Sequence, residues 1–151
     1  MTRFRKVLAL GAASLAAGAI TVVAPGSASA AEYGCAGTLL DTYAVKSAVG
    51  NTLSHIRLYY NAGTGYNCAV NVKTAYYSQF KHDISIFMHN EDFTEDDNNR
   101  PGYNNDSDGG KFQYYAGPIK VYAKGKCVSI TAITYYYDEM AHKYTGPVHC
   151  G

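Results

Sequence analysis

The chain lacks the short motifs that identify most enzymes, and it also lacks tryptophan. It has no GxSxG nucleophile motif, no HExxH or HxxEH zinc motif and no glycine-rich phosphate-binding loop. Its 4 cysteines are never spaced as CxxC, and more than twenty residues separate each from the next, which disfavours a zinc knuckle. Because no catalytic residue can be assigned, we expect a protein that is not an enzyme.

The first 30 residues have the composition of a secretory signal. Three basic residues lie within the first six, an uncharged stretch runs from residue 7 to 23, and Ala28-Ser29-Ala30 provides the small-x-small site that signal peptidase cuts. A membrane anchor is the alternative, but the stretch is rich in Ala and Gly and barely long enough to span a bilayer. We predict a signal peptide over residues 1–30, cleavage after Ala30, and one secreted domain over residues 31–151 that is not attached to the membrane.

The chain has no excess of charge of either sign. Loss of Arg3, Arg5 and Lys6 with the signal reduces the 13 basic residues to 10, against 12 acidic residues, so the formal net charge of the mature part is −2. Such a chain has no electrostatic footprint for nucleic acid or for an anionic membrane. We expect neither as a partner.

All 4 cysteines lie in the predicted mature part. An even count in an exported chain predicts two disulfides, for which three pairings exist. Sequential pairing closes the shorter loops and therefore costs less chain entropy. We predict the disulfides Cys35–Cys68 and Cys127–Cys150.

Alternating hydrophobic residues predict β-strands through most of the mature part. Residues 54–60 and 68–73 alternate, with Cys68, Val70 and Val72 sharing one face, and the glycine-bearing segment 61–65 between them predicts a hairpin. Residues 39–45 fit a strand or a short helix that begins at Thr38, and we favour the strand.

Three further strands are expected around residues 84–88, 119–123 and 127–133, and the Lys124-Gly125 pair predicts a two-residue hairpin between the last two. With the C-terminal segment included, about seven strands are expected. The predicted fold class is all-β: a small antiparallel sandwich or barrel with two disulfides and one long acidic loop.

That acidic loop covers residues 90–110, which contain seven acidic residues and almost no hydrophobic ones. Within it, Asn104, Asp106 and Asp108 follow the spacing of the first half of an EF-hand loop, which makes them candidate calcium ligands. The twelfth position holds Tyr115 in place of the expected Glu. A solvated acidic loop is the commoner explanation, and we expect no other cofactor.

The 15 tyrosines all lie in the mature part, and most occur in adjacent groups. Neighbouring residues of a strand point to opposite faces, so each pair sends one ring to the core, where it replaces tryptophan, and one to solvent. We predict an adhesive surface that contains Tyr59, Tyr76, Tyr114 and Tyr136 and binds polysaccharide or protein. The alternative is the ordinary preference of tyrosine for half-buried strands.

The five histidines of the chain allow a second class of function, acid–base catalysis. A pair of His55, His89 or His149 with a loop carboxylate would allow acid–base hydrolysis, which makes a small secreted hydrolase the main alternative. Disulfide-framed loops would also suit a secreted inhibitor or binding module, although no reactive-site sequence can be identified.

Two blocks carry a family resemblance. The segments LYYNAGTGYNCAV (residues 58–70) and YAGPIKVYAKGKCV (residues 115–128) resemble the spore-associated protein A family of secreted actinobacterial proteins. The resemblance implies a small extracellular protein with four cysteines in corresponding order, held loosely on a cell or spore surface by a wall or spore component. It implies no catalytic residues. The acidic loop between the two blocks is divergent, so the family lends calcium no support.

Overall fold

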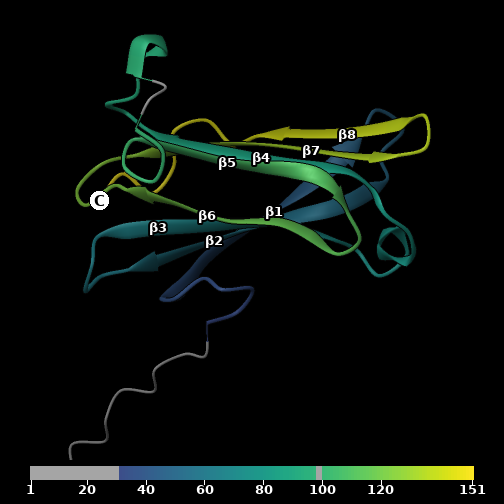
Figure 1. Ribbon diagram of the computed structural model, residues 1–151, viewed down its shortest axis with the longest axis horizontal. Coiled ribbons are helices and arrows are strands. Elements are labelled where there is room, and N and C mark those ends of the chain that lie inside the picture. The colour runs from purple at the N-terminus through teal and green to yellow at the C-terminus, as the bar shows by residue number, and fades with distance from the viewer. Residues whose placement is uncertain (1–30, 98–99) are drawn as a thin grey trace, which may run out of the picture.

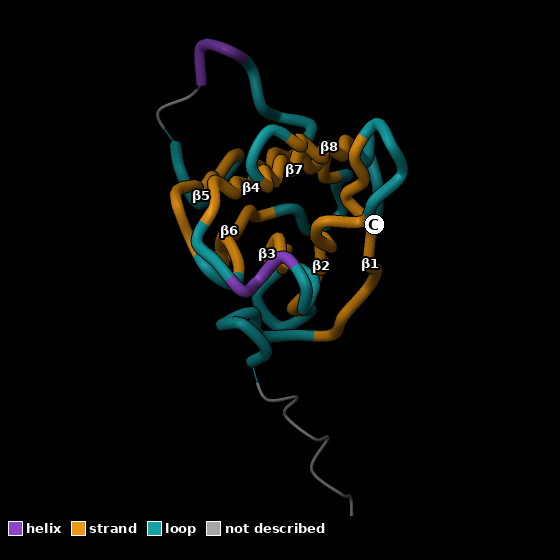
Figure 2. The backbone as a smooth tube through the Cα atoms, turned by 90° about the vertical axis from the view of Figure 1, so that its right-hand side faces the viewer, coloured by secondary structure: helices purple, strands orange, loops and turns teal. Residues whose placement is uncertain are grey.

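A computed structural model describes residues 31–97 and 100–151 as an all-β domain. One antiparallel sheet of eight strands curls into a flattened, nearly closed barrel, as the end-on view in Figure 2 shows. The strands are β1 (Thr38–Ser47), β2 (Thr52–Asn61), β3 (Tyr66–Lys73), β4 (His82–Asn90), β5 (Asn105–Phe112), β6 (Tyr115–Tyr122), β7 (Val128–Tyr136) and β8 (Glu139–Tyr144). The predicted signal peptide and its cleavage site after Ala30 lie outside the described residues.

The strand order is β5-β4-β7-β8-β1-β2-β3-β6, so the first three strands form a meander and β6 returns to pair with β3. In Figure 1, β4, β5, β7 and β8 form one layer, and β1, β2, β3 and β6 form the other. Short 3-10 helices lie in the β3–β4 connection (η1, Tyr77–Gln79) and in the β4–β5 connection (η2, Glu95–Asp97).

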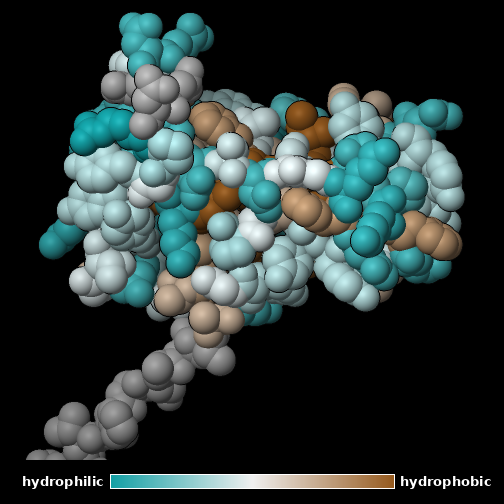
Figure 3. Space-filling view, viewed as in Figure 1, coloured by the Kyte–Doolittle hydropathy of each residue, from teal (hydrophilic) through white to brown (hydrophobic). Residues whose placement is uncertain are grey.

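The core lies between the two layers and follows the strand alternation. On β4 the side chains of Ile84, Ile86 and Met88 are buried, while the residues between them are partly exposed. Burial of each such side chain contributes about 1.5–3 kcal/mol. The face in Figure 3 shows only small, separate hydrophobic patches among polar residues, because most hydrophobic side chains are inside.

A buried polar network connects the two layers within the barrel. The Asn71 Nδ2 group on β3 donates hydrogen bonds to Ser85 O (3.1 Å), Ile133 O (3.4 Å) and Thr134 Oγ1 (3.1 Å). Thr134 Oγ1 also lies 2.6 Å from Ser54 Oγ on β2. Hydrogen bonds between buried polar groups require a specific geometry, so this network helps to fix how the layers sit on each other.

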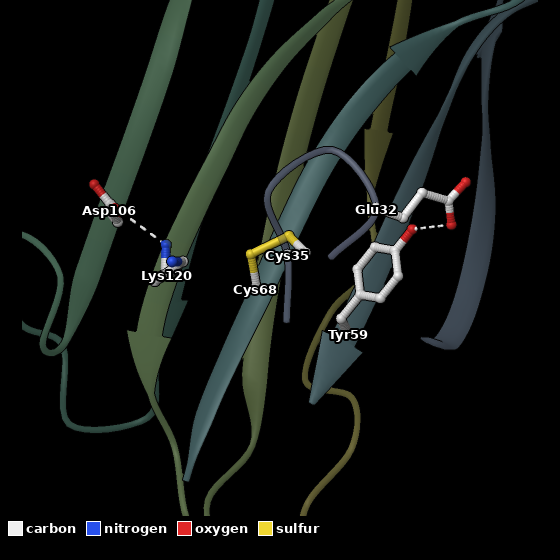
Figure 4. Close-up of a disulfide and its surroundings, with 6 residues drawn as sticks. All are labelled: Glu32, Cys35, Tyr59, Cys68, Asp106 and Lys120. Atoms are coloured by element: carbon white, nitrogen blue, oxygen red, sulfur yellow. Dashed lines mark hydrogen bonds between the residues drawn. A yellow bond between two sulfur atoms is a disulfide. The ribbon is translucent and has the colours of Figure 1, made fainter. Parts of the chain in front are cut away.

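A second, smaller hydrophobic cluster lies outside the barrel. Residues 31–37 cross the outer face of β2 and β3, where Cys35, Tyr59, Cys68 and Val70 are buried together; we call this group the outer cluster. The Cys35–Cys68 disulfide fastens it, as Figure 4 shows. Both predicted disulfides are confirmed, the second joining Cys127 to Cys150.

The two edge strands of the sheet, β5 and β6, lie side by side along what we call the carboxylate seam. Gly117 N donates to Asp108 Oδ2 (2.6 Å), and Lys120 N donates to Asp106 Oδ2 (2.8 Å; Figure 4). Gly117 has a φ of +101°, which glycine adopts without strain, and this turns its N–H toward β5. Side-chain carboxylates therefore close this side of the barrel.

The opposite side, between β1 and β8, is the open seam. The two strands pair only at Lys46 with His142 and at Ser47 with Ala141. The C-terminal tail, residues 145–151, continues along β7, where Val148 and Val128 exchange two backbone hydrogen bonds (2.8 and 3.0 Å). The rest of β1 has no strand partner on this side among the described residues.

Several local predictions can now be judged. Residues 39–45 form a strand, and the β2–β3 hairpin over residues 61–65 is confirmed. The prediction of a hairpin at Lys124-Gly125 was wrong. The chain turns there, but β6 and β7 do not pair with each other: β6 pairs with β3, and β7 pairs with β4 and β8. The acidic loop is shorter than 90–110, because its last third belongs to β5, and the barrel has eight strands.

Candidate functional site

A group of aromatic side chains gathers at the end of the barrel where β3 leads into β4 and β7 turns into β8. We call it the aromatic cluster. Its members are Tyr76, Tyr77, His82, Tyr136 and Tyr137. The first two lie in the β3–β4 connection around η1, His82 begins β4, and the last two end β7 and begin the following turn. Two connections distant in sequence are thus brought to one place.

The rings pack edge to face, which holds each ring in place. Centroid distances are 4.9 Å for Tyr77 and Tyr136, 4.8 Å for Tyr136 and Tyr137, and 5.0 Å for His82 and Tyr136, all T-shaped. This arrangement is the favoured one for aromatic rings and contributes about 0.5–1.5 kcal/mol per pair. Tyr76 and Tyr137 are nevertheless 61% and 69% exposed. The cluster therefore presents rigid rings to solvent.

Two phenols of the cluster, those of Tyr77 and Tyr136, carry no charge at neutral pH. A hydrogen bond with Tyr76, followed by burial, raises the pKa of Tyr136. Burial also raises the pKa of Tyr77. An unperturbed phenol already ionises only near pH 10, so both hydroxyls remain protonated and can donate hydrogen bonds.

A buried ammonium group anchors the connections beneath the cluster. Lys73, at the end of β3, donates from Nζ to Phe112 O (2.7 Å), His82 O (3.3 Å) and Phe80 O (3.4 Å). Its side chain is buried, and this burial lowers the pKa of the amine. Three carbonyl acceptors compensate for part of the lost hydration. Lys73 thereby ties the β3–β4 connection to the β5–β6 turn.

One carboxylate is fixed close to the cluster at the start of β8, where Glu139 pairs with Tyr136. Glu139 Oε1 accepts a hydrogen bond from Asn51 Nδ2 at 2.9 Å. Hydrogen bonds from Ser47 and Asn51 lower the pKa of this carboxyl group, because they stabilise its charged form. The rim of the cluster therefore contains both a fixed acceptor and neutral hydroxyl donors.

The four tyrosines predicted to form one adhesive surface have different positions. Tyr76 and Tyr136 meet in the aromatic cluster, with centroids 5.9 Å apart. Tyr114 is exposed in the β5–β6 turn but makes no ring contact within the described part of the chain. Tyr59 was wrongly predicted as a surface residue: it is 3% exposed, and its hydroxyl donates to Glu32 Oε2 at 2.8 Å (Figure 4).

The prediction missed Tyr59's burial because the covering segment, residues 31–37, is distant in sequence. It also missed three members of the cluster: Tyr77, Tyr137 and His82. Tyr77 and Tyr137 stand next to predicted residues, but the assumption that one ring of each pair points inward excluded them. Tyr76 and Tyr77 lie in a connection, where strand alternation does not apply.

The candidate calcium ligands lie near the carboxylate seam. Asp106 and Asp108 are on β5, and one oxygen of each carboxylate accepts a backbone N–H of β6. Asn104 is buried, and its Oδ1 has no partner among the described residues. Within the described residues, no three His, Cys, Asp or Glu side chains are grouped to hold a metal ion. Calcium binding stays a prediction.

The histidines proposed for acid–base chemistry are dispersed. His55 lies half-buried on β2, and the ring of His89 packs against Phe93 with its Nδ1 3.1 Å from Asn90 O. His149 lies 3.9 Å from Asp41, the one His–carboxylate pair within 4.0 Å in the described ranges. The structure thus brings one candidate histidine to an acid, and that acid is on β1 and outside the predicted loop.

No helix in residues 31–97 or 100–151 has the length and hydrophobicity needed to cross a membrane. Comparison with known proteins places the chain in no family: no family model, no curated protein and no solved structure matches it.

Proposed function

We propose that this is a secreted, non-catalytic protein that stays loosely attached to the surface of a cell or spore by binding a polysaccharide through the aromatic cluster. The observation that carries this proposal is the exposure of Tyr76 and Tyr137 within a packed group of five rings. Such rings offer flat hydrophobic surface for the faces of sugars at little cost in conformational entropy.

The surroundings of the cluster favour a neutral, hydroxyl-rich partner. The Tyr77 and Tyr136 phenols are uncharged and can donate, while the fixed Glu139 carboxylate accepts. The Lys73 ammonium beneath the cluster is buried, and its three hydrogen bonds go to carbonyl groups. A polysaccharide matches this combination of apolar ring faces and hydroxyl groups. The two disulfides support function in an oxidising, extracellular setting.

The test compares two double variants in a pull-down with intact spores, isolated cell wall and cellulose. Tyr76→Ala with Tyr137→Ala removes the exposed rings of the cluster. The matched control, Tyr114→Ala with Tyr144→Ala, removes two similarly exposed rings outside it. We expect about tenfold weaker retention of the cluster variant, since each lost ring contact is worth roughly 0.5–1.5 kcal/mol. Equal retention of both variants, or no retention of the wild type, would overturn the proposal.

A hydrolase is the second candidate, and the His149–Asp41 pair favours it. Tyr43 Oη lies 3.5 Å from His149 Nε2, so a donor, an imidazole and a carboxylate meet at the edge of β1. The test is a screen of glycan, ester and nucleic-acid substrates with the wild type and with His149→Ala. Turnover that is lost in the variant would replace the binding proposal by this one.

A further inference from the structure

The open seam ends in a pocket at the barrel mouth opposite the aromatic cluster. The pocket encloses about 240 Å³ between β1 and the tail. Its walls are formed by Leu40 of β1, Tyr60 of β2, Asn67 of β3, Ala123 after β6, and His149 and Cys150 of the tail. Tyr60 and Asn67 are register partners in the β2–β3 ladder, so they occupy the same level of the barrel.

The tail is held in place as a wall of this pocket. The Cys127–Cys150 disulfide and the Val128–Val148 pair fasten it to the start of β7. On the other side, His149 contacts Tyr43 and Asp41 of β1, at 3.5 and 3.9 Å. The pocket therefore exists because the tail spans a gap that the backbone of β1 and β8 leaves unpaired.

Asn67 gives the pocket an unsatisfied polar group. The residue is 2% exposed, and its Oδ1 atom has no hydrogen-bond partner among the described residues. A buried acceptor without a donor is unfavourable, and such groups in folded proteins need an explanation. The Oδ1 of the neighbouring Asn71 likewise has no partner among the described residues, but the Nδ2 group of Asn71 is fixed by hydrogen bonds and the residue lines no pocket described here. The Asn67 amide has freedom to turn toward a ligand, because the terminal torsion of Asn is broad.

We propose that this pocket binds a small neutral molecule with an apolar, single-ring body and one hydroxyl group, which donates a hydrogen bond to Asn67 Oδ1. The volume is below the range of about 300–1,000 Å³ that is typical of sites for drug-sized ligands, so the occupant is small. Leu40, Ala123 and the ring of Tyr60 contact the apolar body. This site is at the other end of the barrel from the aromatic cluster, and it does not depend on the proposed function.

The test follows backbone amide shifts by NMR while the protein, with both disulfides formed, is titrated with p-cresol or with toluene. The two probes differ only in the hydroxyl group. We expect saturable shifts at Asn67, Ala123 and Cys150 with p-cresol, and about tenfold weaker binding of toluene, since it leaves the buried acceptor unpaired. Shifts that do not saturate, that map elsewhere, or that show equal affinity for both probes would overturn the proposal.

Two variants identify the acceptor. Asn67→Leu keeps a side chain of similar size but removes the amide, so p-cresol should bind it no better than toluene. His149→Ala, at the rim of the same pocket, should keep the preference for p-cresol. If Asn67→Leu folds and still prefers p-cresol, Asn67 is not the acceptor and the inference fails. If Asn67→Leu does not fold, the comparison of p-cresol with toluene on the wild-type protein still tests the proposal.

Discussion

The carboxylate seam and the open seam close the same barrel by different means. At the first, two aspartates of β5 reach across and accept backbone N–H groups of β6. At the second, β1 and β8 share two register pairs, and a disulfide-anchored tail spans the remaining gap. Both seams border a pocket: one of about 360 Å³ that Asp108 and Gly117 help to line at the carboxylate seam, and one of about 240 Å³ that the tail helps to line at the open seam. The difference teaches that the way a seam closes decides what forms the walls of its pocket: the strands and their connections at the first seam, and a segment outside the sheet at the second.

Removal of the two carboxylates should have the largest effect on stability. In Asp106→Ala with Asp108→Ala, the N–H groups of Lys120 and Gly117 lose charged acceptors worth about 1.5–3 kcal/mol each. We expect a loss of about 4 kcal/mol in the free energy of unfolding, measured by guanidinium denaturation. Asp106→Asn with Asp108→Asn keeps an acceptor oxygen at each position and should lose less. An Ala variant as stable as the wild type would show that the seam does not depend on these bonds.

Removal of the disulfide at the open seam should have a slightly smaller effect. Cys127 and Cys150 are 23 residues apart, and the loop-entropy model assigns about 3 kcal/mol to a bridge of this span. In Cys127→Ala with Cys150→Ala, we also expect faster hydrogen exchange along residues 38–45 of β1. The amides of Gly117 and Lys120 serve as the control and should keep their protection. Equal acceleration at both seams would mean that they are not independent.

The smallest effect concerns Tyr43, which faces the tail at the open seam. Burial, followed by a hydrogen bond with Asp41, raises the pKa of Tyr43 to about 12. Because the folded pKa exceeds the unfolded value of 10.0, the stability that this group contributes is complete below pH 10 and is lost as the pH rises through 12. Tyr59, in the outer cluster, has its pKa raised to about 12 by burial and then by its bond to Glu32.

An ultraviolet titration of phenolate formation should therefore show one late tyrosine fewer in Tyr43→Phe than in the wild type, in which the pKa values of Tyr43, Tyr59, Tyr77 and Tyr136 are raised. We expect the stability of this variant at neutral pH to change by less than about 1 kcal/mol, because the phenol is only half-buried. If Tyr43→Phe shows as many late phenols as the wild type, the pKa of about 12 belongs to another tyrosine.

Much of the barrel could be predicted from strand alternation, and the carboxylate seam shows where this signal was misread. Asp106 and Asp108 follow a two-residue period, which is the period of a strand and also that of the first ligands of a calcium loop. Without hydrophobic residues in the segment, the loop was the simpler interpretation. The two carboxylates lie on β5, where they accept backbone N–H groups of β6. A pattern within one segment does not reveal which groups of a distant segment need hydrogen-bond partners.

For a similar reason, the sequence did not reveal which face of β3 points into the barrel. Cys68, Val70 and Val72 alternate as a core face should, yet Cys68 and Val70 belong to the outer cluster under residues 31–37. The opposite face, with Asn67 and Asn71, points into the barrel, and this polar face supplies both the buried network and the pocket. Hydrophobic alternation shows that a face is covered, but it does not show what covers it.

The Lys124-Gly125 turn illustrates the remaining limit. Turn residues predict that the chain reverses, and Lys126 N does bond to Ala123 O across the turn at 3.2 Å. They do not specify which strand will be the next neighbour. That choice depends on β3, which pairs with β6, and on β4, which pairs with β7. Such long-range pairings were not accessible from local sequence.

The meander β1-β2-β3 carries one further consequence, which concerns the order of events during folding. Its three strands are consecutive, and Cys35 and Cys68 both lie in or beside it, so this third of the domain can form its disulfide before the later strands pair. The barrel, in contrast, waits for the last residues, because β8 and Cys150 are at the far end of the chain. We expect an assembly in which the cross-linked sheet of β1, β2 and β3 forms first and serves as the template on which the later strands pair.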